Sequence, residues 1–218
     1  MSILESITFG APLVDALHNA GVGVKMVDDF DKVQSLEVKL SSKAPHPMLS
    51  LARNDFVNDQ AFWLFLFRED QPIASLAAKF FDLSNETLES YLRRTSRNQY
   101  DRSTDPILEV DPMVGLLRGR MVYVGNLNVV DTEQGNIKVL SRYARLMQLI
   151  CIAKWRFDWM YGFVSEDHVK LNRLYQFGMT VHDAISWERP SPDGRLDSHA
   201  LLASSRRQLT SLFRRQTY

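Results

Sequence analysis

Hydrophobic positions in the first half of the chain follow helical and strand-like patterns in turn. Apolar residues recur every three or four positions over 30–40, which predicts a helix with one buried face. A short alternating segment over 22–27 precedes it and predicts a strand. The apolar runs 61–67 and 73–81 are separated by the polar segment 68–72. This arrangement is typical of a hairpin of two buried strands.

The second half alternates strands and helices more regularly. An apolar strand is predicted over 121–130, interrupted by Gly125-Asn126. The segments that follow are predicted to be a turn at 131–136, a long helix to about residue 157, a strand at 158–164, a helix at 166–177 ending at Gly178, and strands at 180–187 and 198–204. Together these patterns predict a single domain over 1–218, of the α/β class, with a mixed sheet and flanking helices.

Two segments stand outside this alternation. An insertion over 84–118 separates strands that would otherwise be adjacent, and long connections of this kind often form lids or binding loops. Ser84 is expected to cap a helix there, and 93–106 is expected to be an exposed, arginine-rich loop. At the C-terminus, 206–218 is expected to be a basic amphipathic helix or a frayed end. Ala44-Pro45-His46-Pro47 is expected to end the helix that begins near residue 30.

Composition and charge exclude several classes of protein. Lys and Arg number 26 and Asp and Glu also number 26, so the net charge gives no general reason to bind nucleic acid or a membrane surface. No apolar run approaches the roughly 20 residues that span a bilayer, and the N-terminus lacks signal-peptide features. We therefore expect a cytoplasmic protein. Cys151 is the only cysteine, which excludes internal disulfides, and its apolar neighbours indicate a buried side chain. The five histidines show no metal-ligand spacing, so no metal is expected.

Gly125 and Asn126 are the first candidates for chemistry. Glycine inside a strand indicates a bulge, and a bulge releases a backbone N–H from the ladder. Such a donor can polarise a carbonyl in the manner of an oxyanion hole. Asn126 and Asn128 are two positions apart, so both amides are expected on one face, as possible substrate contacts. A bulge that only bends the sheet remains the alternative.

The start of the long helix is the second candidate. Backbone N–H groups and the helix dipole favour an anion at a helix N-terminus. Gln134, Gly135, Asn136, Ile137 and Lys138 open this helix, and Arg142 follows Lys138 one turn later. The segment is therefore a candidate diphosphate site, with an ordinary polar connection as the alternative.

The order of elements over 22–204, and the stretch 121–179 above all, resembles the GNAT superfamily of acyl-CoA-dependent N-acyltransferases. Members have a bulged strand, here 122–130, then a pyrophosphate-binding turn and long helix, here from Gln134. A later helix ends in a Tyr-x-x-x-Gly-Phe-like signature, here Leu174-Tyr175-Gln176-Phe177-Gly178-Met179. Two departures are visible: Ile137 and Val139 replace small residues of the turn, and Gly178 follows Tyr175 by three positions rather than four.

The resemblance implies transfer of an acyl group from an acyl-CoA or acyl-carrier-protein thioester to a small-molecule amine, in a ternary complex. It implies that the bulge holds the carbonyl, that the turn holds coenzyme A phosphates, and that Tyr175 protonates the departing thiolate, a role that suits a phenol with a pKa near 10. The general base stays open, with Glu109 and Asp111 or Glu166 and Asp167 as candidates. Four arginines of the insertion, Arg93, Arg94, Arg97 and Arg102, could receive an acidic carrier protein, with a solvated charged loop as the alternative. The alternative function is a non-catalytic GNAT-like module that binds a ligand or partner.

Overall fold

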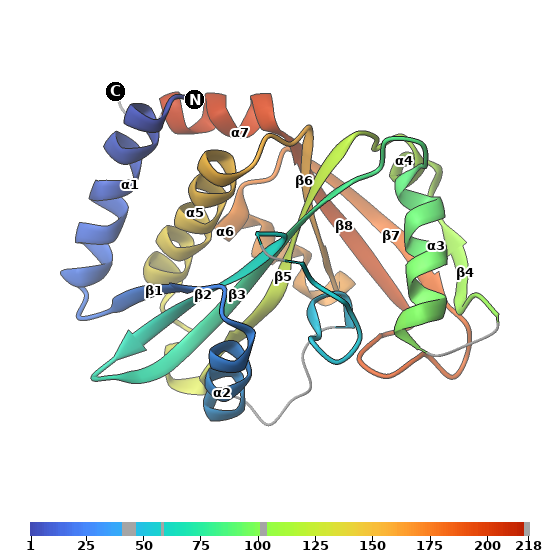
Figure 1. The fold of residues 1–218 in the computed structure, drawn as a ribbon, viewed down its shortest axis with the longest axis horizontal. Coiled ribbons are helices and arrows are strands. Elements are labelled where there is room, and N and C mark those ends of the chain that lie inside the picture. The colour runs from blue at the N-terminus through green and yellow to red at the C-terminus, as the bar shows by residue number, and fades with distance from the viewer. Residues whose placement is uncertain (41–46, 58, 101–103, 216–218) are drawn as a thin grey trace.

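The computed structural model describes residues 1–40, 47–57, 59–100 and 104–215. Eight strands form one sheet in the order β1-β2-β3-β5-β6-β8-β7-β4 (Figure 1). Among the strands of the described residues, β5 and β6 run parallel, and every other neighbouring pair is antiparallel. The strands are β1 (Gly23–Val27), β2 (Ala61–Arg68), β3 (Gln71–Asp82), β4 (Ile107–Val110), β5 (Arg120–Val129), β6 (Trp159–Val164), β7 (Met179–Trp187) and β8 (Ser198–Ser205). The expected single α/β domain with a mixed sheet is confirmed.

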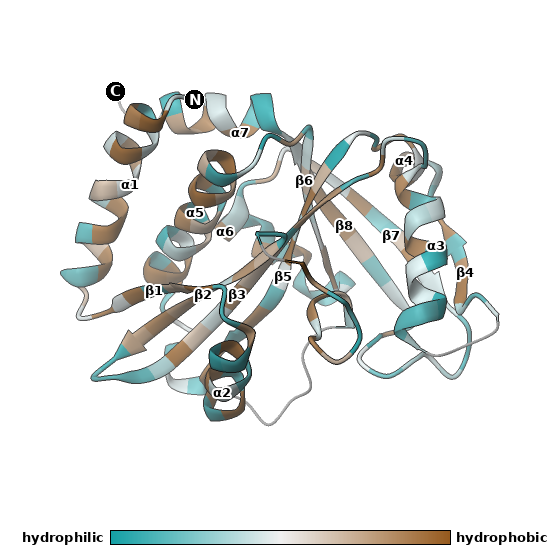
Figure 2. Cartoon of the chain, viewed as in Figure 1, coloured by the Kyte–Doolittle hydropathy of each residue, from teal (hydrophilic) through white to brown (hydrophobic). Residues whose placement is uncertain are grey.

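Helices cover both faces of the sheet. They are α1 (Ile3–His18), α2 (Phe30–Leu40), α3 (Leu88–Gln99), α4 (Pro112–Gly115), α5 (Ile137–Lys154), α6 (Asn172–Tyr175) and α7 (Arg206–Arg215), with short 3-10 turns at Pro47–Leu49, Asp131–Glu133 and Glu166–Leu171. Buried side chains of α1, α5, α6 and α7 fill a core on one face. Those of α2, α3 and α4 fill a second core on the other face. Figure 2 shows the apolar residues concentrated along the strands and α5. None of the helices in the described segments is long and apolar enough to cross a bilayer.

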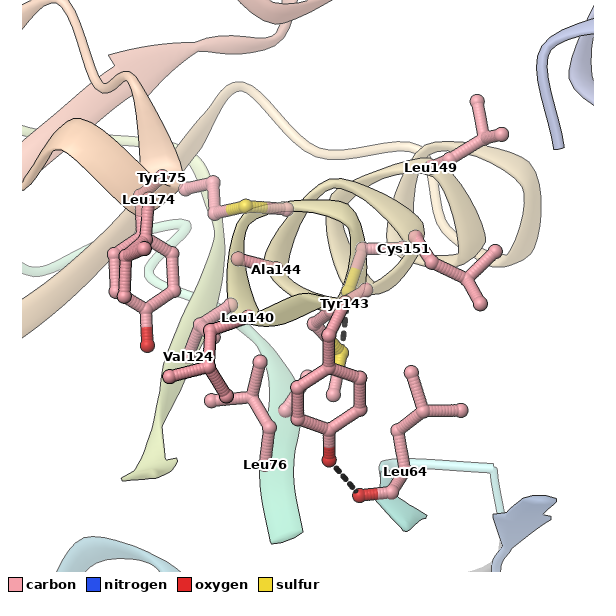
Figure 3. Packing of buried hydrophobic residues seen from close by; sticks show 14 of the residues in the cluster. Leu64, Leu76, Val124, Leu140, Tyr143, Ala144, Leu149, Cys151, Leu174 and Tyr175 are labelled. Carbon is pink, nitrogen blue, oxygen red and sulfur yellow. Dashed lines mark hydrogen bonds between the residues drawn. The ribbon is translucent and has the colours of Figure 1, made fainter. Parts of the chain in front are cut away.

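The long helix α5 is anchored to the sheet at its centre. Its inward residues include Leu140, Tyr143 and Met147, at the spacing of one helix face. The buried Tyr143 hydroxyl donates a hydrogen bond to the carbonyl oxygen of Leu64 in β2 (Figure 3). Cys151 lies in the same core with no exposed surface, and burial raises the pKa of its thiol. The expected buried cysteine is confirmed.

The hairpin of β2 and β3 forms as expected, with a tighter turn. Glu69 and Asp70 alone connect the strands, and both have positive φ values of 48° and 63°. A two-residue turn of this kind matches the right-handed twist of the paired strands. The hairpin places Ala77 of β3 opposite Gly125 of β5, and so it forms one side of the candidate site.

The insertion differs from its predicted structure. Its helix α3 begins after Thr87, whose hydroxyl accepts a hydrogen bond from the Ser90 N–H; Ser84 is not the cap. The expected loop at 93–106 is wrong in its first part, because α3 continues to Gln99 and buries Leu92, Ser96 and Gln99. Farther on, β4 pairs with β7 and extends the sheet at its far edge. Of the segment 44–47, where α2 was expected to end, residues 44–46 lie outside the described residues, and Pro47 begins a 3-10 turn.

The helix predicted over 166–177 is also shorter. A 3-10 turn leads into α6, which ends at Tyr175, and Gln176 caps it in the left-handed conformation at φ 54°. Gly178 is therefore not the capping glycine. The Asn172 side chain closes this reversal: its Nδ2 donates to the Phe177 carbonyl oxygen, and its Oδ1 accepts from the Phe177 N–H, both at 2.9 Å. The C-terminal segment forms α7, an amphipathic helix that buries Leu209 and Phe213.

Candidate functional site

The two parallel strands separate at the centre of the sheet. β5 and β6 pair only from Met121 with Trp159 to Tyr123 with Tyr161. Beyond Tyr123 the strands diverge, and a cavity of about 300 Å³ opens between them. Its lining residues include Gly125, Asn126 and Asn128 from β5, Gly162 and Phe163 from β6, and Tyr175 from α6. The splay therefore exposes backbone of both strands at one place in the middle of the sheet.

A bulge in β5 lies at this opening. The register between β3 and β5 shifts between Ser75 and Ala77, and Asn126 takes the left-handed conformation at φ 57°. The predicted bulge at Gly125-Asn126 is thus present. A β-carbon on Gly125 would lie 2.7 Å from the Tyr123 hydroxyl oxygen, so this position accepts only glycine without rearrangement. Glycine here brings the Tyr123 hydroxyl close to the bulged backbone.

Two side-chain amides beside the bulge meet a buried carboxylate. Glu37 of α2 is 9% exposed, and its Oε2 accepts hydrogen bonds from Nδ2 of Asn126 at 3.1 Å and of Asn128 at 3.4 Å. Asn126 and Asn128 therefore lie on one face, as the period of two predicts. Glu37 Oε1 is buried without a hydrogen-bond partner in the described part of the chain. A buried carboxylate oxygen with a vacant lone pair can accept a proton from a ligand.

Sequence reasoning missed Glu37, although one signal was available. Glu37 follows Val33 by one helical turn, on the face of α2 that turns toward the sheet. A carboxylate on the apolar face of an amphipathic helix is unusual, because an ionised group is rarely buried without partners. The two asparagine amides supply those partners from β5.

Tyr175 forms another wall of the cavity. It is 6% exposed, and its ring stacks on that of Phe177 at 5.4 Å between centroids. Figure 3 shows it beside Leu174, with Val124 of β5 nearby. Burial raises the pKa of the Tyr175 phenol above its ordinary value, so the group stays protonated at neutral pH. Gln176 takes the left-handed conformation and turns the chain sharply after Tyr175. The turn is therefore made by Gln176, and Gly178 follows Tyr175 by three positions.

The predicted diphosphate segment lies at the start of α5, outside the residues that line this cavity. The Asn136 N–H donates to the Glu133 carbonyl oxygen at 3.0 Å, and the Ile137 N–H to that of Gly135 at 2.9 Å. Gly135 has open space around it, and the Asn136 side chain makes no capping hydrogen bond. Val139 is buried, while Lys138 is exposed. The first turn of α5 therefore offers uncapped N–H groups beside a lysine.

Ile137 and Val139, the bulky residues of this turn, do not cover the N-terminal end of α5. Val139 belongs to the core beneath α5, and Ile137 packs against that core. Gln134 is held locally, because its Nε2 donates to Asp131 Oδ1 at 2.8 Å. Arg142 lies at a different cavity, between α5, α1 and α7, together with Arg145. Of the residues predicted to bind phosphates, only those at the start of α5 therefore lie together, and Arg142 does not join them.

The predicted carboxylates do not gather at the cavity. Glu109 is exposed on β4, and three strands separate β4 from β5. Asp111 caps α4 through the Met113 N–H, and Glu166 accepts from the Asp183 N–H while it contacts His182 Nδ1, both at 2.7 Å. No cluster of three or more His, Cys, Asp or Glu side chains suitable for a metal occurs among the described residues.

Comparison with known proteins finds similar structures but no match to a family model or to a curated protein. An N-acyl amino acid synthase from uncultured soil microbes is similar in structure, with a TM-score of 0.50 and 7% identity; the match covers 87% of this chain and 93% of that protein. The spermidine/spermine N-acetyltransferase of Vibrio cholerae matches at a TM-score of 0.49 and 10% identity, over 89% and 99% of the two chains.

An N-acetyltransferase from Staphylococcus aureus is a third match, with a TM-score of 0.46 and 7% identity over 85% of this chain and 97% of that one. The identities are low, so these likenesses concern the fold. The chain has the fold of the GNAT-superfamily N-acyltransferases.

Proposed function

We propose that the protein is an N-acyltransferase that moves an acyl group from a thioester to an amine. The observation that carries the proposal is the cavity between β5 and β6, which has a bulged backbone at Gly125 and Asn126 on one side and a protonated tyrosine, Tyr175, on another. Acyl transfer needs a donor for the carbonyl oxygen and an acid for the leaving sulfur. This opening supplies a group for each.

The reaction follows from these positions. The amine nitrogen attacks the thioester carbonyl carbon, a C–N bond forms, and the C–S bond breaks. Backbone N–H groups released at the bulge stabilise the oxygen as it gains charge. Tyr175 gives its proton to the departing thiolate, and Glu37 takes the proton that the attacking nitrogen loses, directly or through water. Direct attack needs no nucleophile from the protein, which agrees with the buried Cys151.

For the donor, we propose acyl-CoA. The uncapped first turn of α5 and the exposed Lys138 would contact its phosphates, and the open surroundings of Gly135 leave room for them. An acyl-carrier-protein donor is supported less well. Of the arginines expected to receive it, Arg93 already forms ion pairs with Glu89 and Asp105, and Arg94 pairs with Glu86. Arg102 lies outside the described residues.

A non-catalytic ligand-binding module is the second candidate. The observation that favours it is the engagement of the Asn136 and Ile137 N–H groups in the turn, which leaves fewer donors for a diphosphate. The two candidates differ in turnover, whereas both allow a thioester to bind.

Ligand binding and turnover together test the proposal. Thermal unfolding is followed with acetyl-CoA, long-chain acyl-CoA thioesters and acyl-carrier thioesters, with free coenzyme A as the reference. A ligand at a hundredfold excess over its dissociation constant stabilises the fold by about 2.7 kcal/mol. Release of free thiol is then measured with a panel of amines. We expect stabilisation by a thioester and amine-dependent thiol release. Stabilisation without release would favour the non-catalytic module, and no stabilisation by any thioester would contradict both the donor and the enzyme.

A further inference from the structure

A buried lysine lies on the same face of the sheet as Glu37. Lys79 of β3 is 3% exposed and pairs in register with Tyr123 of β5. Aromatic rings surround its ammonium group: Nζ lies 5.8 Å from the ring centroids of Phe81 and Tyr91 and 6.0 Å from that of Phe56. In the described part of the chain, no carboxylate forms an ion pair with Lys79. A buried ammonium group without a counter-ion costs free energy, so its presence needs a reason.

A second cation lies close to this lysine. Arg195 is 8% exposed, its Nε donates to the Tyr100 hydroxyl at 2.9 Å, and its guanidinium group lies 4.5 Å from the Trp187 ring centroid. Burial, together with the positive charge of Arg195, lowers the pKa of Lys79 to about 7. Two cations that repel one another in a buried setting favour the binding of an anion between them.

The surrounding polar groups are also donors. Within the described residues, Tyr161 Oη, Trp187 Nε1 and His199 Nδ1 are buried and have no hydrogen-bond partner. An indole N–H can only donate, and a phenol or a neutral imidazole can donate as well. Burial and Arg195 lower the pKa of His199 to about 4, so this ring is neutral at pH 7. The site thus combines two cations and three unpaired groups that can donate, an arrangement suited to the oxygens of a carboxylate.

This cluster adjoins the proposed reaction centre. The Tyr123 ring lies 5.2 Å from that of Tyr161, and the Tyr123 hydroxyl lies beside Gly125 at the bulge. The cavity between β5 and β6 reaches Gly194, the residue before Arg195. A ligand held at the cluster would therefore lie next to the position proposed for the acyl carbon.

We propose that Lys79 and Arg195 bind a carboxylate of the acceptor, so that the acceptor is an amino acid with an apolar or aromatic side chain rather than a simple amine. This identification of the ligand as the acceptor rests on the proposed N-acyl transfer. The carboxylate would lie between the two cations, the amine would face the bulge and Glu37, and the rings of Phe56, Phe81 and Tyr91 would contact the side chain.

Matched pairs of ligands that differ only in the carboxylate test this directly. Binding is measured by calorimetry, without thioester, for phenylalanine and 2-phenylethylamine, tyrosine and tyramine, tryptophan and tryptamine, and leucine and isopentylamine. We expect at least one amino acid to bind tenfold or more tightly than its decarboxylated partner. Lys79→Met and Arg195→Gln should each abolish that preference, whereas Lys25→Met, which changes an exposed strand lysine, should keep it. Absence of a carboxylate preference in every pair would overturn the inference.

Two further measurements distinguish carboxylate binding by Lys79 from a purely structural role of this residue, and distinguish failure of this inference from failure of the proposed function. If Lys79 only supports the fold, Lys79→Met should lower the unfolding temperature; we expect it to be unchanged or higher. Should that variant not fold, Lys79→Gln and Arg195→Lys give the same comparison. Equal acylation of amino acids and simple amines would overturn the inference and leave the transferase proposal intact. A carboxylate preference without any thioester binding would contradict the transferase and retain an amino acid site.

Discussion

The carboxylate of Glu37 accepts a hydrogen bond from the side-chain amide of Asn126 at 3.1 Å, although 89 positions separate the two residues in the sequence. One residue belongs to α2 and the other to the bulge of β5. Their contact joins a candidate proton acceptor to the backbone that would hold the thioester carbonyl. The distance between reacting groups in the proposed site therefore depends on how α2 packs on the sheet.

Glu37→Gln should slow acyl transfer without preventing thioester binding. The amide keeps the shape of the side chain but cannot accept a proton at neutral pH, and loss of a general base costs about 10²–10⁴-fold in rate. Steady-state thiol release gives kcat, and thermal shift gives thioester affinity. Glu86→Gln in the insertion is the control and should retain the wild-type rate. An unchanged kcat in Glu37→Gln would assign the proton transfer to another group.

Tyr175→Phe should lower kcat by about 10²-fold or more, because the thiolate would leave without its acid. The ring and its stacking on Phe177 are kept, so the unfolding temperature should change little. The effect should shrink when the leaving thiol is made more acidic, for instance with a thiophenyl ester. Equal losses with both kinds of thioester would indicate that Tyr175 positions the substrate and does not protonate sulfur.

Lys138→Met and Arg142→Met should differ in their effect on acyl-CoA binding. Lys138 is exposed beside the uncapped turn of α5, whereas Arg142 lines a separate cavity against α1. We expect KM for acyl-CoA to rise about tenfold in Lys138→Met, because the loss of one charge contact of about 1.4 kcal/mol weakens binding by that factor. In Arg142→Met we expect KM to change little. Lys138 is expected to contact the phosphates of acyl-CoA. For a thioester that lacks the nucleotide part, KM should therefore be equal in Lys138→Met and Arg142→Met.

Gly125→Ala should destabilise the protein, because the added methyl group would lie 2.7 Å from the Tyr123 hydroxyl oxygen and 2.9 Å from two ring carbons. Overpacking of this kind costs about 1–3 kcal/mol. Gly135→Ala is the matched control, since no atom lies within 4 Å of its added carbon, and its effect should stay within about 0.5 kcal/mol. Chemical denaturation measures both. The double variant with Tyr123→Phe should recover part of the loss, and no recovery would place the clash elsewhere.

The stability of the wild-type protein should rise with pH through the titration of Lys79. Its pKa is lowered from 10.5 to about 7 in the folded state, so between these values the unfolded chain binds a proton that the native chain does not. The free energy of unfolding then increases with pH by up to about 1.4 kcal/mol per pH unit from this group. Denaturation curves at pH 7, 8 and 9 should therefore diverge between wild type and Lys79→Met. Parallel curves would mean that Lys79 keeps its ordinary pKa.

Local patterns in the sequence determine much of the fold. The apolar runs predict β2 and β3, and the glycine within an apolar strand predicts the bulge of β5. Alternation of strands with helices predicts the α/β class. These features are visible because side-chain periodicity and glycine both act over a few residues, so no knowledge of the chain path is needed.

Tertiary structure alone decided the rest. Gln176 could take the left-handed conformation at the end of α6 because Asn172 holds the reversal, and β4 found its partner β7 far along the chain. The approach of Glu37 to Asn126, and of Arg195 to Lys79, likewise depends on which helices and loops pack over the same face of the sheet. Charge and hydrogen bonding act through space, and the sequence distance between two such groups carries no information about their separation. Candidate residues that lie close together in sequence, such as Lys138 and Arg142, were for the same reason placed at different surfaces.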